Sequence, residues 1–172
     1  MNLQGPKPFI SPSQTAPSYW QRGILWDVLM SADATAGEFT LLEQLMPEES
    51  GPPAHRHERA SEGFYLLEGE VEYTIGENDD VRLARAGDAV WIPKGTKHAF
   101  RVISRTARCL NFYTPGGFDD HPPYLAVPAA SHSLPPKDFE AAVDPMRRHV
   151  DSEKNSSYLN RLRDLHEETW EN

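Results

Sequence analysis

Three histidines and one glutamate are spaced as in a mononuclear metal site: His55, His57, Glu62 and His98. On a strand, His55 and His57 would share a face, because side chains at i and i+2 point the same way. Imidazole nitrogens and a carboxylate oxygen suit Fe, Ni, Mn, Co, Cu or Zn, and ligand type alone does not choose among these metals. Such a set leaves coordination positions open, which is typical of a catalytic site. We predict one divalent transition metal per chain.

The elements that must position these residues are predicted to be short β-strands separated by Gly, Pro and Asp turns. Val71, Tyr73 and Ile75 alternate with polar residues, as in a strand with one buried face. Many short strands of this kind indicate an all-β barrel or sandwich. The strands are predicted at Gly23–Met30, Glu38–Met46, Gly63–Ile75 with a bend at Gly69, Val81–Ala84, Ala89–Ile92, Lys97–Ile103 and Ala107–Tyr113.

The predicted β-barrel, residues 19–117, is flanked by two segments of different composition. Residues 1–18 contain four prolines among small polar residues, so we expect an extended arm. The arm is either a loose tail or a segment that packs along a neighbouring subunit. Residues 118–172 begin with a proline-rich loop and then show helical patterns at Asp138–Val150 and Ser157–Trp170. We expect these helices to pack on the outside of the barrel.

Charge and composition exclude several classes of partner. The chain has 17 Lys and Arg against 26 Asp and Glu, a net charge of −9, which argues against nucleic acid and anionic membranes. It has no apolar run of transmembrane length and no signal-peptide pattern at its start. Cys109, the single cysteine, cannot form an internal disulfide and is expected to be a packing residue. We therefore expect a cytoplasmic protein.

Two segments carry a specific resemblance to a known family. Gly51–Gly69 and Gly87–His98 resemble the first and second motifs of the cupin superfamily. The resemblance implies a single cupin barrel, a double-stranded β-helix or jelly roll, over about residues 38–117, with the same four metal ligands. The Gly-Pro-Pro-Ala-His-Arg-His run, with Tyr113–Phe118 after the barrel, is similar to quercetin-2,3-dioxygenase-like monocupins. The resemblance also implies a homodimer, because cupin barrels commonly pair through their sheets.

The leading functional hypothesis is a metal-dependent dioxygenase of a small enolisable or aromatic, flavonol-like molecule. Glu62 is the predicted catalytic residue, either as a fixed ligand or as a base that leaves the metal. Glu43 and Gln44 alternate in a strand, so one of them faces inward, where it could contact a ligand histidine. The candidate walls of the substrate pocket are Phe64, Tyr73, Trp91, Phe100 and Phe112.

Two alternatives remain open from the sequence. The first keeps the metal as a Lewis acid in an isomerase, cyclase or decarboxylase, in which Glu62 moves a proton. The second is a non-catalytic barrel that binds a small molecule. A solvated pair of histidines in a polar loop would explain His55 and His57 alone, but it would not explain their combination with Glu62 and His98.

Overall fold

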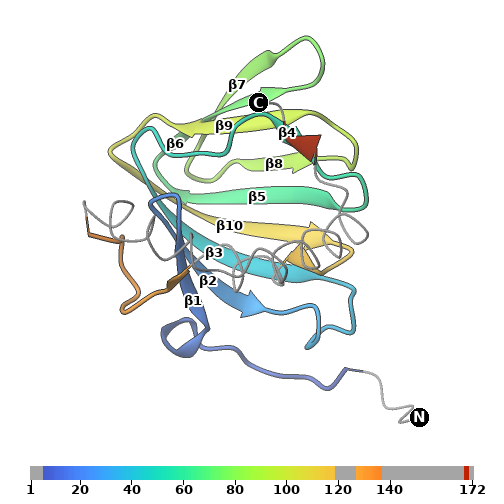
Figure 1. Ribbon diagram of the computed structural model, residues 1–172, viewed down its shortest axis with the longest axis vertical. Coiled ribbons are helices and arrows are strands. Elements are labelled where there is room, and N and C mark those ends of the chain that lie inside the picture. Colours follow the sequence, from blue (N-terminus) through green and yellow to red (C-terminus); the bar gives the residue numbers. More distant parts are fainter. Residues whose placement is uncertain (1–5, 119–126, 137–168, 171–172) are drawn as a thin grey trace, which may run out of the picture.

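The computed structural model describes residues 6–118, 127–136 and 169–170. The strands are β1 (Ser18–Gln21), β2 (Ile24–Met30), β3 (Thr40–Pro47), β4 (His55–Arg56), β5 (Ser61–Glu68), β6 (Glu70–Ile75), β7 (Asp80–Arg85), β8 (Ala89–Ile92), β9 (His98–Val102), β10 (Thr106–Thr114), β11 (Val127–Pro128) and β12 (Thr169–Trp170), and η1 is a 3₁₀ turn at Ser13–Thr15. They form a seven-stranded sheet, β11-β1-β2-β3-β10-β5-β8, and a five-stranded sheet, β12-β4-β9-β6-β7 (Figure 1). All pairings are antiparallel, and the predicted all-β barrel is confirmed.

The bend predicted at Gly69 separates β5 from β6. Gly69 has a φ of 84°, a left-handed conformation that glycine adopts without steric cost. A Cβ atom at this position would lie 2.4 Å from the Thr106 carbonyl oxygen, so the close approach of β10 also requires glycine. The sequence did not predict β1, which pairs along its whole length with β2.

The C-terminal helix predictions fall almost entirely outside the described residues. Asp138–Val150 is not among them, and of Ser157–Trp170 the structure describes only Thr169 and Trp170. These two residues form β12, which pairs with Arg56 and His55 on β4. A segment far along the chain therefore lies beside the strand that carries the first predicted ligand (Figure 1).

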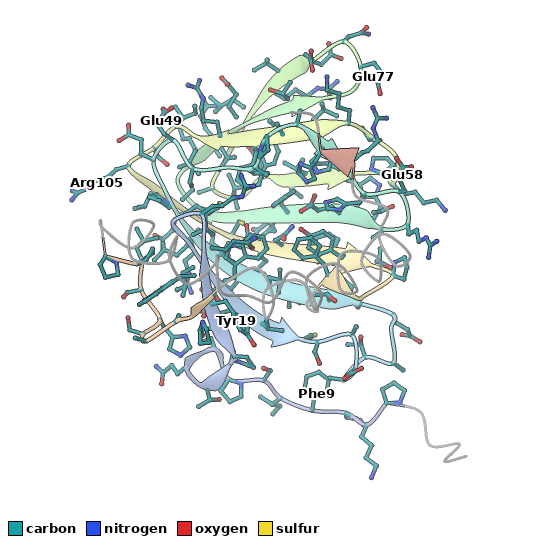
Figure 2. The ribbon with its side chains drawn as sticks, viewed as in Figure 1. Phe9, Tyr19, Glu49, Glu58, Glu77 and Arg105 are labelled. Atoms are coloured by element: carbon teal, nitrogen blue, oxygen red, sulfur yellow. The ribbon has the colours of Figure 1, made fainter. Side chains whose placement is uncertain are left out.

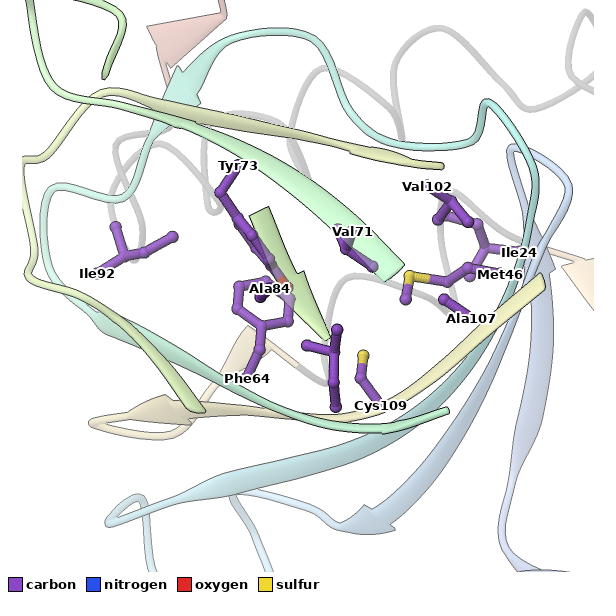
Figure 3. Packing of buried hydrophobic residues seen from close by; sticks show 11 residues of the cluster. Ile24, Met46, Phe64, Val71, Tyr73, Ala84, Ile92, Val102, Ala107 and Cys109 are labelled. Atoms are coloured by element: carbon purple, nitrogen blue, oxygen red, sulfur yellow. The ribbon is translucent and has the colours of Figure 1, made fainter. Parts of the chain in front are cut away.

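The barrel core lies between the two sheets. Burial alternates along β3 and β10, so each strand has one inward and one outward face. The inward apolar residues form a cluster that includes Phe64, Val71, Tyr73 and Cys109 (Figure 3). Burial raises the pKa of the Cys109 thiol far above its usual range, and the charges of Glu62 and Glu43 add to this effect. Cys109 is therefore a neutral packing residue, as predicted.

The first described residues of the N-terminal arm are exposed. Residues 6–10 are exposed, and Phe9 and Ile10 show 45% and 93% of their surface to solvent. Figure 2 shows Phe9 on the stretch that extends from the lower edge of the barrel. No helix in the described part of the chain is both long enough and apolar enough to cross a membrane.

Candidate metal centre

The four predicted ligands come from both sheets and meet inside the barrel. His55 on β4 and His98 on β9 are direct cross-strand partners in the five-stranded sheet. His57 follows β4, and Glu62 lies on β5 of the seven-stranded sheet. All four side chains are buried, with 2% to 6% of their surface exposed. Two solvated histidines in a loop would not be buried, so this alternative does not apply.

The ligand atoms converge closely enough for one ion. All four lie within 4.8 Å of one another. His55 Nε2 is 3.2 Å from His57 Nε2, and Glu62 Oε2 is 3.3 Å from His57 Nε2 and 2.9 Å from His98 Nε2. Two ligands at a right angle around an ion with bonds of about 2.1 Å are separated by about 3 Å. These distances therefore fit coordination of a single transition metal.

Backbone carbonyls fix which ring nitrogens face the cluster. The Nδ1 atoms of His55 and His98 each lie 2.9 Å from a carbonyl oxygen, of Pro53 and Thr96 respectively. A carbonyl only accepts hydrogen bonds, so each Nδ1 donates, and each neutral ring turns a bare Nε2 lone pair inward. The Nε2 lone pair of His98 then faces the Glu62 carboxylate, which requires a cation or a proton between them. The residues fit a bound metal ion.

Electrostatics favour the protonation states that bind metals. Burial, with the neighbouring His98 and His57, lowers the pKa of His55 to about 4. Burial alone would raise the pKa of Glu62, but when a proton rather than a metal lies between the carboxylate and the rings, hydrogen bonds and charge from His57 and His98 outweigh burial and hold that pKa well below its usual range. At neutral pH, His55 is therefore neutral and Glu62 is ionised, as metal ligands must be.

A polar network behind Glu62 was mostly missed from the sequence. Glu62 Oε1 accepts hydrogen bonds from Tyr113 Oη at 2.5 Å and from Asn111 Nδ2 at 2.9 Å. Asn111 Oδ1 in turn accepts from Gln44 Nε2 at 3.2 Å. Of the Glu43 and Gln44 pair, Gln44 is the inward residue, whereas the Glu43 carboxylate pairs with an arginine, Arg108. The sequence signal that could have indicated this network was Asn111, a polar residue at an inward position of an otherwise apolar strand.

A small cavity of about 50 Å³ opens onto the cluster. Its apolar walls include Ile24, Trp26, Pro52, Phe100 and Phe118. It is also lined by three of the predicted ligands, together with Gln21, Gln44 and Tyr113.

The five predicted wall residues lie in three different positions relative to the cavity. Phe100 lines the cavity, and it shares the inward side of β9 with His98. Phe64 and Tyr73 lie deeper, in the core cluster, with their ring centroids 5.7 and 5.9 Å from that of Phe100. Trp91 and Phe112 do not line the cavity, so the prediction that they form its walls is corrected. Their rings stack on each other with centroids 6.1 Å apart, and Trp91 is 52% exposed. Each is next to an inward residue in its strand, so it points outward.

The family model of the cupin domain matches residues 41–113, which contain all four predicted ligands. Residues 41–113 are therefore a cupin domain. A curated relative, the quercetin 2,3-dioxygenase of Bacillus subtilis (strain 168), is 29% identical over 102 residues. That match covers 59% of this chain but 29% of the relative, so this chain spans less than a third of the relative's length.

Several solved structures share the fold of the barrel. KdgF from Halomonas sp. has a TM-score of 0.59 at 16% identity, over 66% of this chain and 99% of that one. An RmlC-like cupin from Shewanella frigidimarina has a TM-score of 0.57 at 16% identity, over 68% and 99%. A predicted oxalate decarboxylase from Thermotoga maritima has a TM-score of 0.56 at 20% identity, over 62% and 99%. At such identities the likeness shows the fold and carries no activity over to this chain.

Proposed function

We propose that this cupin is a metal-dependent dioxygenase of a small enolisable or aromatic molecule. The observation that carries the proposal is the convergence of three imidazole nitrogens and one carboxylate oxygen on the wall of an apolar cavity. The partial similarity to a quercetin 2,3-dioxygenase supports oxygen chemistry over other metal chemistry. Such a substrate loses a proton and takes up both atoms of O2, so the site must bind an apolar ring or chain and accept one proton.

The chain's own residues suit these two tasks. A divalent transition metal held by the four ligands would supply Lewis acidity and electronic coupling between the substrate and O2. Trp26, Phe100 and Phe118 provide an apolar surface that excludes water from the reacting carbon. Among the described residues that line the cavity, Glu62 is the only carboxylate. Because Glu62 is ionised, its Oε2 can bind the metal or, if it leaves the metal, accept the substrate's proton.

The size of the cavity limits the substrate. Pockets that enclose a drug-sized ligand measure about 300–1,000 Å³. The cavity beside the cluster measures about 50 Å³, which holds only the reacting end of a molecule. We therefore place small enolisable compounds ahead of flavonols, which would have to extend through the mouth.

Oxygen uptake tests the proposal directly. Metal-reconstituted protein is assayed with a small 1,3-dicarbonyl compound, a catechol and a flavonol, beside His57→Ala, which removes a ligand. The matched control is His132→Ala, since His132 lies on the outside of the barrel, 3.1 Å from Asp27. Uptake that His57→Ala loses and His132→Ala keeps supports the dioxygenase.

The other results separate the alternatives. Turnover that continues without O2 replaces the proposal with an isomerase, cyclase or decarboxylase. Substrate binding without turnover, unchanged when the metal is stripped, replaces it with a binding barrel. Because each result concerns a different step, the three functions cannot be confused.

A further inference from the structure

We propose that Tyr113, Asn111 and Gln44 are positioning residues that hold Glu62 in one orientation, with a single oxygen facing the histidines. The sequence left two roles open for Glu62, a fixed ligand and a base that leaves the metal. The contacts around its carboxylate favour the fixed ligand. The inference rests on the metal site proposed above, and it holds for any of the reactions considered there.

The two oxygens of Glu62 have different surroundings. Oε2 faces the His57 and His98 rings, at 3.3 and 2.9 Å. Oε1 points the other way and accepts hydrogen bonds from Tyr113 and Asn111. Hydrogen bonds to an ionised carboxylate are roughly twice as strong as neutral ones, so two of them on one oxygen strongly favour this orientation. Oε1 is therefore occupied, and Oε2 is the atom left for a metal.

Strand pairing places both donors at the carboxylate. Tyr113 on β10 is the direct partner of Glu62 on β5, and Asn111, two residues earlier, shares the inward face of β10. The Tyr113 ring is held in turn by Phe118, at a centroid distance of 4.1 Å and an interplanar angle of 12°. Neither donor can follow Glu62 if it turns away, because both are buried in the sheet.

The charge of Glu62 sets the orientation of the amides behind it. The carboxylate accepts only, so Asn111 must turn its NH2 toward Glu62 and its Oδ1 toward Gln44. Gln44 must then turn its own NH2 toward Asn111, which leaves its Oε1 facing the Cys109 sulfur at 3.6 Å. Each group has one consistent orientation, so Gln44 supports Glu62 without touching it.

The network also limits what Glu62 can do in a reaction. If Glu62 swung away from the metal, the Tyr113 hydroxyl and the Asn111 amide would both be left buried without their acceptor, which is costly. We infer that Glu62 stays in place as a ligand through Oε2 and does not act as a base that leaves the metal. Residues behind the ligand thereby set the geometry of the ligand itself.

Co(II) titration followed by visible absorption tests this inference, because the Co(II) bands report coordination number and geometry. The variants are Tyr113→Phe, which removes the hydroxyl at Oε1, and Gln44→Met, which removes an amide that does not contact Glu62. The matched control is Tyr73→Phe, since the buried Tyr73 hydroxyl has no hydrogen-bond partner in the described part of the chain.

We expect Tyr113→Phe to weaken Co(II) binding 10- to 100-fold and to change the Co(II) spectrum. Gln44→Met should weaken Co(II) binding and change the spectrum in the same direction, but by less. Tyr73→Phe should keep the Co(II) affinity within about twofold of the unsubstituted protein and leave the spectrum unchanged. Thermal unfolding of each metal-free variant shows whether it is folded. If Tyr113→Phe does not fold, the Gln44→Met variant tests the positioning role.

Unchanged affinity and an unchanged spectrum in the folded variants would overturn the positioning role. Absence of Co(II) binding by the unsubstituted protein would overturn the metal site and this inference together. Co(II) binding with the expected variant effects, but without O2 uptake, would support the inference while the dioxygenase proposal fails.

Discussion

Acidification of the metal-free protein should lower its free energy of unfolding by about 2.5 kcal/mol between pH 7 and about pH 4.5 through His55 alone. In the unfolded chain, His55 has its ordinary pKa of 6.5; in the folded protein, burial and then His98 and His57 lower it to about 4. Between these values the unfolded chain binds a proton that the folded protein does not. Stability is therefore present above the unfolded pKa and is lost as the pH falls toward the folded one.

Urea denaturation in the presence of a chelator measures this loss. The unsubstituted protein and His55→Gln are compared at pH 7 and at about pH 4.5, because Gln does not titrate and groups away from the cluster titrate equally in both proteins. The pH dependence should be about 2.5 kcal/mol smaller in His55→Gln. Equal pH dependence in the two proteins, within about 0.5 kcal/mol, would refute the argument that burial keeps His55 neutral and ready to bind metal.

Three further predictions concern the fold, the cavity and assembly. Gly69→Ala should destabilise the protein by about 2–4 kcal/mol in urea denaturation, clearly more than Gly76→Ala, which has a similar φ but nothing within 4 Å of its Cβ. Phe100→Ala should change KM at least about tenfold, while Phe112→Ala on the outer face should not, unless the cavity is not the binding site. The unsubstituted chain should elute as a homodimer in size exclusion, and removal of residues 1–12 should weaken the association of the two chains. Elution of the unsubstituted chain at monomer mass would contradict the homodimer.

Local signals predicted most of the fold. The turn residues lie where strands end, and Gly69 bends the chain for a reason visible in the structure, the approach of Thr106. The ligand set was also predictable, because no common structural role places three histidines and a glutamate at these spacings. The inward orientation of the His55 and His98 Nε2 atoms depends on the backbone carbonyls of Pro53 and Thr96, which no spacing reveals.

The cavity walls were harder to predict because strand parity depends on pairing. Trp91 and Phe112 are large apolar residues in strands, yet they pack over Gly63 on the outer face, where a Cβ would lie 2.1 Å from the Phe112 ring. The network behind Glu62 was missed for the same reason. Asn111 and Tyr113 reach Glu62 because β10 pairs with β5, a long-range contact that local patterns do not encode.

Elemental analysis of the purified protein beside His57→Ala and His132→Ala tests the central claim most directly. We predict close to one equivalent of a transition metal in the unsubstituted protein and in His132→Ala, and loss of that metal in His57→Ala. Fe, Ni, Mn or Cu would favour oxygen chemistry, whereas Zn alone would favour Lewis-acid chemistry. Absence of metal after reconstitution, or full retention of metal in His57→Ala, would contradict the metal centre described for His55, His57, Glu62 and His98.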